Sequence, residues 1–429
     1  MISWSDFQRE CRFLLAQRSI YGVLIVALGL SIFSVWSGLA EVNAQRDTIE
    51  RLVQKDALDR ADAIAKHHDY GSVAYYSFHL TYDEPSPLAF AAMGQRDVFP
   101  WKHRIRMLAI EGQIYETDAD NPELSLVGRF DFAFYVSVLL PLFVILLTYS
   151  LRSSEREAGR HDLLIVTSQS QRKLWLTRAV VLNLSLFVVI CVPFVISALI
   201  SGAIFSRILL VLFIVFAHTV FWACISLFVG VGERFAQLHS TRIASLLVGV
   251  WLLLSVVLPV SISTWVELSV ASPKGGDVVL TQREAVNDAW DLPFDATWDA
   301  FLATHPKWAD STEMTGSFEW KWYYAFQQVG DQKAALLSNA YREATQKRNE
   351  LAGWGSLLSP PMLTQRLLSE VAGTDTAAML AYESRVRDYH QSLRYFYYPL
   401  LFGSDEFSQE TLSTLPQFEP DNKRGDIRH

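Results

Sequence analysis

Long apolar stretches alternate with polar ones along this chain of 429 residues. Each of five apolar stretches has the roughly 20 residues that a helix needs to cross the hydrocarbon core of a bilayer. We therefore expect a mainly α, polytopic helical membrane protein with five transmembrane helices. The expected spans are residues 19–40, 130–151, 174–200, 207–231 and 243–266.

The polar stretches differ in length and character. Residues 1–18 place apolar and basic side chains at helical spacing, which predicts an interfacial helix on the cytoplasmic face of the bilayer. Residues 152–173 form a short charged island between two spans and are expected to include a helix over 153–167. The two long stretches, 41–129 and 267–429, are expected to be extracytoplasmic regions.

The first extracytoplasmic region is expected to be α+β. Up to about Lys66 it extends the first span, because opposite charges recur at helical spacing. The runs 77–82 and 104–110 suggest strands. The second region is expected to be helical, with helices over 319–351 and 362–396.

Two aromatic clusters in the second region have two interpretations. Residues 320–326 and 395–398 could pack between helices, or they could form a surface at the membrane interface, where amphipathic rings gather. We favour the interface for 395–398 and leave 320–326 open.

Charge fixes the expected orientation. Eleven Lys and Arg residues lie in or beside the segments 1–18, 152–178 and 232–242, whereas the short link 201–207 has only Arg207. Basic residues concentrate on the cytoplasmic side, so these three segments are expected there.

The overall composition excludes two further features. A net charge of −8 argues against a nucleic-acid partner. The three cysteines lie outside the expected external regions, so no disulfide is expected.

The charged island resembles a segment of a known protein family. Its residues Glu155-Arg156-Glu157, Gly159, Leu163-Leu164 and Thr167-Ser168, followed by Arg172 and Arg178, resemble the coupling segment of type-2 ABC-transporter permeases. The resemblance implies that this segment docks on a separate cytoplasmic ABC ATPase, and that a second permease copy or a paralogue completes a homo- or heterodimer. The residues implied in ATPase coupling are Arg152, Glu155, Arg156, Glu157, Gly159, Arg160, Leu163 and Arg172. An ordinary solvated loop between two spans is the other interpretation.

If residues 153–167 form one helix, Glu155 and Gly159 share a face and Glu157 points elsewhere. Glycine inside a helix costs about 1 kcal/mol relative to alanine, which suggests close backbone approach at Gly159. Many family members have proline in the turn after the Leu pair, where this chain has Ser168-Gln169-Ser170-Gln171.

The resemblance extends over most of the chain. Stretches 85–90, 94–100, 111–116, 359–368, 372–375 and 389–394 resemble one branch of these permeases, catalogued as a domain of unknown function with large extracytoplasmic insertions. The family usually has six spans, and five are found here.

Candidate chemistry is sparse. No Walker-type phosphate loop occurs, so ATP hydrolysis is expected on a partner chain, and neither enzymatic activity nor a cofactor is expected of this one. His218, Thr219 and Asn183 are polar positions inside spans and are candidates for a membrane path, although a hydrogen bond within the bundle is the simpler interpretation of His218.

The spans lack the buried carboxylates typical of ion-coupled carriers. His67, His68 and Asp69, with His79 and His103, match no standard metal-site spacing, and a solvated polar turn is favoured over a metal site.

The sequence thus favours the permease subunit of an ATP-driven transporter in the bacterial inner membrane, surrounded by lipid and with a large external domain suited to an extracytoplasmic partner. The alternative is a non-transporting membrane scaffold or sensor with a large extracytoplasmic domain.

Overall fold

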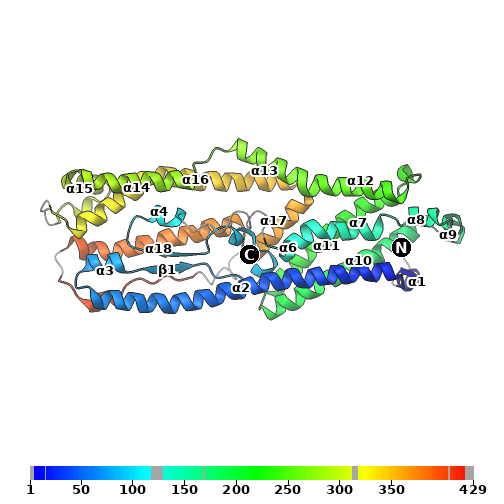
Figure 1. The fold of residues 1–429 in the computed structure, drawn as a ribbon, viewed down its shortest axis with the longest axis horizontal. Coiled ribbons are helices and arrows are strands. Elements are labelled where there is room, and N and C mark those ends of the chain that lie inside the picture. Colours follow the sequence, from blue (N-terminus) through cyan, green and yellow to red (C-terminus); the bar gives the residue numbers. More distant parts are fainter. Residues whose placement is uncertain are drawn as a thin grey trace.

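The computed structural model describes residues 4–14, 16–116, 129–167, 170–311, 317–403 and 406–420. The molecule is elongated and mostly helical (Figure 1). One half, here called the apolar half, holds the helices that are rich in apolar residues. Helices α1 (Trp4–Leu14), α8 (Ser153–Glu157) and α9 (His161–Thr167) lie at its outer end. The other half, the polar half, holds most of the remaining helices and two short strands.

The five expected spans are confirmed as helices long and apolar enough to cross a membrane, judged by length and composition. Within two of them the helix changes type along its length. The second comprises α6 (Phe132–Phe134), a π-helical segment (Tyr135–Leu139), α7 (Leu140–Thr148) and α8 (Ser153–Glu157). The fifth comprises α12 (Ser240–Leu252), a π-helical segment (Leu253–Val257) and α13 (Leu258–Ser269). The others are α2 (Arg18–Lys66), α10 (Gln171–Ile200) and α11 (Phe205–Val231).

Both π-helical segments lie directly before a proline in the first turn of the next helix, Pro141 in α7 and Pro259 in α13. Proline has no backbone N–H and its ring crowds the preceding turn. A locally widened turn absorbs both effects without ending the span.

Helix α2 runs along both halves (Figure 1). Its 49 residues correspond to about 74 Å. The apolar first part packs on α10, where Ser31 donates to the carbonyl of Ile190 at 2.8 Å. The second part is supported by i,i+4 ion pairs such as Arg60–Asp56 at 2.9 Å. The predicted extension of the first span to about Lys66 is confirmed.

The first polar segment is α+β, but its sheet is smaller than predicted. β1 (His79–Tyr82) pairs antiparallel with β2 (Lys102–Ile105), with His79 opposite Ile105. The segment after Ile105 leaves the sheet and becomes helix α4, so the expected strand over 104–110 is mostly wrong. The segment also contains α3 (Tyr70–Tyr76), α4 (Ile110–Tyr115) and the 3-10 turns Ala89–Ala91 and Gly94–Asp97.

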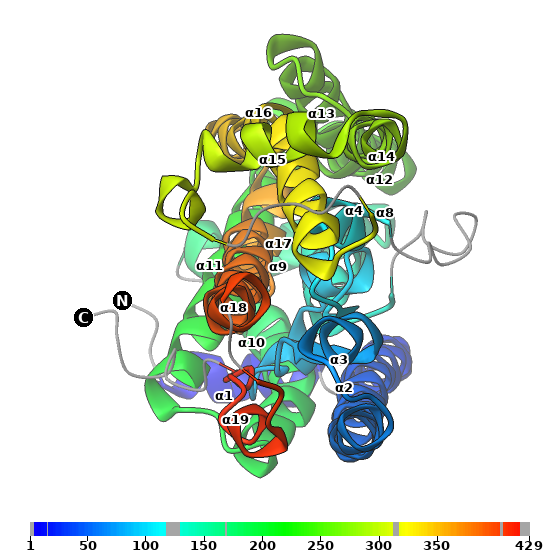
Figure 2. The ribbon, with the colours of Figure 1, turned by 90° about the vertical axis from the view of Figure 1, so that its left-hand side faces the viewer.

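The second polar segment is helical, as expected, and α18 lies between α2 and the layer of α14 and α16 (Figures 1 and 2). The single helix expected over 362–396 is divided at Gly373, whose φ of 68° ends α17. Its helices are α14 (Gly275–Asp291), α15 (Phe294–Leu302), α16 (Trp320–Ser356), α17 (Pro360–Ala372), α18 (Thr376–Phe402) and α19 (Gln409–Leu412), with a 3-10 turn at Pro306–Trp308.

The turn between α16 and α17 does not stay in the polar half. Ser359 donates to the carbonyl of Leu254 at 2.7 Å, and Thr364 is 2.8 Å from His218. Leu254 lies 15 residues from the end of α13, and His218 lies 13 residues from the start of α11, so both contacts are about 20 Å along their spans. Residues 354–372, expected outside with the rest of 267–429, therefore lie level with the spans.

The aromatic cluster at 395–398 lies at the far end of the polar half, away from the apolar half (Figure 1). Tyr397 and Tyr398 are buried, and Tyr398 packs edge-on against Phe301. The expected interface position is wrong for these rings, because α18 runs away from the spans and not toward them. In the other cluster Trp322 and Phe326 are also buried, so it contributes to the core.

Candidate functional site

The charged island forms two short helices instead of one. α8 ends at Glu157, and α9 (His161–Thr167) begins four residues later. Between them Gly159 has φ of 69°, a left-handed conformation that costs other residues roughly 1–2 kcal/mol. The predicted continuous helix is therefore wrong, and Glu155 and Gly159 do not share a helical face. Among the described residues, nothing lies within 4 Å of the position of a Cβ atom at Gly159, so within this chain the glycine serves the turn.

A buried chain of charges joins α8 to α10 and to α1 (Trp4–Leu14). Arg178 of α10 donates to Glu10 at 3.0 Å and to Glu155 at 2.9 Å, and these three side chains are 5%, 6% and 8% exposed. Glu155 also accepts from Arg160 at 2.8 Å. Removing one partner of such a buried pair typically costs about 3–5 kcal/mol. The structure thus directs Glu155 inward, whereas the resemblance implies a place for it at the surface that meets a partner.

Arg152, just before α8, and the other charged side chains of α8 hold the link between α11 and α12, which contains the 3-10 turn Glu233–Phe235. Arg152 donates to the carbonyl of Val231 at 2.9 Å, and Arg156 to that of Leu238 at 2.6 Å. Glu157 accepts at 2.8 Å from the first backbone N–H of α12. Through these contacts α8 is fixed to the ends of three spans.

The outer part of the island is α9. Leu163 is 66% exposed and Val166 is 82% exposed, at the end of the molecule farthest from the polar half (Figure 1). Arg172, at the start of α10, is also exposed. The turn over 168–171 lies partly outside the described residues. The eight expected coupling residues are therefore neighbours, but their side chains divide into an inward, bracing set and an outward set.

The three candidate path residues do not converge. Asn183 donates to the carbonyl of Ala179 and Thr219 to that of Val215, each one turn back in its own helix. His218 is the member that contacts another element, since its Nδ1 lies 2.8 Å from the Thr364 hydroxyl. The simpler interpretation of His218, a hydrogen bond within the bundle, is confirmed, although its partner comes from a helix that was expected outside.

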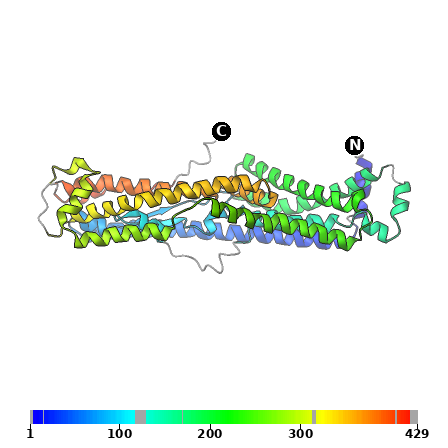
Figure 3. The same cartoon turned by 90° about the horizontal axis from the view of Figure 1, so that it is seen from above.

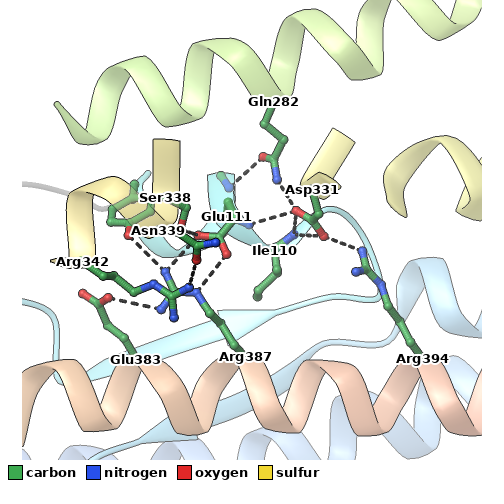
Figure 4. A network of polar contacts seen from close by, with 12 residues as sticks. Ile110, Glu111, Gln282, Asp331, Ser338, Asn339, Arg342, Glu383, Arg387 and Arg394 are labelled. Atoms are coloured by element: carbon green, nitrogen blue, oxygen red, sulfur yellow. Dashed lines mark hydrogen bonds and ion pairs between the residues drawn. The ribbon is translucent and has the colours of Figure 1, made fainter. Parts of the chain in front are cut away.

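A second polar network, in the polar half, was not found from the sequence (Figure 4). Arg387 of α18 forms two hydrogen bonds of 2.9 Å to Glu111 of α4, which also accepts from Ser338 at 2.7 Å. Burial alone would raise the pKa of Glu111, but Arg387 and Ser338 outweigh burial and lower it. Glu383, one turn before Arg387, accepts from it at 3.3 Å, and burial raises the pKa of Glu383.

The same network fixes the start of α4. Asp331 of α16 accepts from the backbone N–H of Ile110 at 2.8 Å and from Arg394 at 2.6 Å. Gln282 of α14 donates to Asp331 at 2.6 Å and accepts from the N–H of Gly112 at 2.7 Å. Two chain segments separated by four spans are thereby held together. The sequence feature that could have indicated this network is the charged stripe of α18, in which residues 383, 387 and 394 share a face.

The histidines considered for a metal site are dispersed. His67 stacks on Tyr76 with ring centroids 4.4 Å apart. His79 and His103 are buried and meet Tyr389 and Tyr382, at 3.3 and 3.1 Å. Within the described ranges, no three His, Cys, Asp or Glu side chains gather as metal ligands would.

Comparison with known proteins adds one similarity. The family model described as Domain of unknown function (DUF3526) matches residues 278–421. This region contains α15 to α19 and most of α14, and so includes the α16–α17 turn and the partners of Glu111. No curated protein matches the chain. No solved structure matches it either.

Proposed function

We propose that this chain is the membrane permease subunit of an ATP-driven type-2 ABC transporter in the bacterial inner membrane. The observation that carries the proposal is the α8–α9 hairpin, which is fixed rigidly to three spans and presents an apolar outer helix beyond them. A coupling element needs both properties, since it must be recognised by a soluble partner and must pass its displacement to the spans.

The contacts indicate how force would travel. Arg178 ties the hairpin to α10, while Arg152 and Arg156 tie it to the link between α11 and α12. A push on α9 would therefore move the ends of several spans together. From α11 and α12 the displacement reaches α17 through His218 and Leu254, and so reaches the polar half.

The nucleotide would be bound and hydrolysed by a separate cytoplasmic ABC ATPase. This chain lacks a Walker-type phosphate loop, so it has no such means of holding ATP phosphates. A second copy or a paralogue would complete the transporter. The polar half would face the extracytoplasmic side, where it could meet a further partner.

The test uses Val166→Asp, with the ABC ATPase encoded nearest to this chain co-expressed. A charge at the centre of an apolar contact must be desolvated, so the amount of ATPase that co-purifies should fall at least about tenfold. Leu336→Asp is the matched control, because Leu336 is 80% exposed on α16 in the polar half. ATPase retention should be unchanged in this control.

If Val166→Asp keeps the ATPase and its transport-coupled hydrolysis, the hairpin is an ordinary loop, and the proposal fails. If wild-type chain retains no ATPase at all, the alternative of a membrane scaffold or sensor replaces it.

A further inference from the structure

Helix α1 lies crosswise at the ends of the spans, in the end of the apolar half remote from the polar half (Figures 2 and 3). One side of it packs on α10, where Glu10 and Leu14 are buried. The rest of its surface exposes Trp4 and Arg12, and Phe13 is half-exposed although Arg178 of α10 lies over its ring at 5.1 Å. A helix with this division of side chains, lying across the spans, fits the plane of a bilayer surface.

A hollow lies along the exposed side of α1, next to the start of α2. It is lined by Gln8, Arg9, Arg12, Phe13, Ala16 and Gln17. Both charged residues of the lining, Arg9 and Arg12, are basic. Arg9 has its carboxylate contacts, to Asp6 and Glu10, at 3.3 Å, while Arg12 has no ion pair among the residues that the structure describes. Two amide side chains and an exposed aromatic ring complete the lining.

We propose that this hollow binds the phosphate headgroup of an anionic phospholipid. The planar guanidinium of arginine matches two phosphate oxygens at once, and amide groups can donate to the others. The proposal rests on the membrane placement in the proposed function.

The position of the hollow fits a lipid better than a soluble phosphate. Gln17 immediately precedes α2, and the buried apolar positions of α2 begin at Ile20, so the hollow lies at the level where headgroups meet hydrocarbon. Phe13, which lines the hollow, is 47% exposed. Rings at this level contact the first carbons of an acyl chain, which a free phosphate ion does not have.

A lipid in the hollow would also stabilise the position of the α8–α9 hairpin. The α1 helix that lines the hollow carries Glu10, which shares Arg178 with Glu155 of α8. In addition, Asp6 of α1 pairs with Lys173 at 3.1 Å, close to the start of α10. Holding α1 on the bilayer surface therefore holds the buried charge chain together.

The test is native mass spectrometry of the purified full chain, titrated with phosphatidylglycerol or with phosphatidylcholine. Wild-type chain should bind the anionic lipid about tenfold more tightly. Arg12→Gln should lose most of this preference, since one charge-assisted contact corresponds to about tenfold in affinity. Arg12→Lys should keep part of it. Arg51→Gln removes the same charge from an exposed site of α2 in the polar half and should keep all of it.

An unchanged preference in Arg12→Gln, or an equal loss in Arg51→Gln, would overturn the proposal. Competition by glycerol 3-phosphate at the same concentration as the lipid would overturn it in favour of a soluble phosphate site. The measurement requires no ATPase, so its failure is distinct from a failure of the proposed transport function.

Discussion

At the scale of single residues, three buried histidines make the polar half sensitive to acid. Burial lowers the pKa of His79 to about 3 and that of His103 to about 4, and it lowers the pKa of His390 well below its ordinary value. These rings stay neutral in the folded chain, whereas in the unfolded chain they take up protons below about pH 6.5. Stability is therefore present above pH 6.5 and is lost as the pH falls toward 4, and His103 alone accounts for about 2 kcal/mol between pH 7.5 and 5. We expect the drop in Tm between these pH values to be smaller in His103→Asn than in wild type, and unchanged in His68→Asn, an exposed control. An equal drop in all three proteins would contradict this prediction.

At the scale of elements, the α16–α17 turn is predicted to lie in the hydrocarbon layer. Its hydrogen bonds to the middle of two spans fix its depth, and Leu358 in this turn is 66% exposed. A nitroxide label at Leu358 should be relaxed more by oxygen, which concentrates in hydrocarbon, than by a water-soluble nickel chelate. A label at Leu336, 80% exposed on α16 in the polar half, should show the reverse order. Both labels are compared by electron paramagnetic resonance in lipid nanodiscs. Equal access of the nickel chelate to both positions would mean that the turn lies in water.

At the scale of the whole molecule, the distribution of charge predicts which half faces which compartment. The hairpin, α1 and the link before α12 carry most of the basic residues near the spans, so this end is predicted to be cytoplasmic and the polar half extracytoplasmic. In a cysteine-free background, a cysteine at the exposed Ala300 should react with a membrane-impermeant maleimide added to intact cells. A cysteine at the exposed Ser170 should react only after lysis. Labelling of Ser170 in intact cells would reverse the assigned orientation.

The sequence by itself determined the features that depend on neighbours along the chain. The five spans follow from the length of apolar runs, and the extension of α2 follows from i,i+4 charges such as Arg60 and Asp56. The position of the charged island between two spans follows from the same pattern. The glycine at position 159 is also a local signal, and the left-handed turn that it supplies divides the helix predicted over 153–167.

Only the tertiary structure decided which charges are used inside the molecule. The pairing of Glu155 with Arg178 and Glu10, and of Glu111 with Arg387, joins residues far apart in the chain, and many other pairings satisfy the same composition. The contact of α17 with His218 could not be predicted from the sequence for a related reason. With 13 residues α17 is too short to register as a span, and its depth is set by the helices that it packs against. Side-chain burial and depth are properties of these long-range contacts, and a local pattern does not contain them.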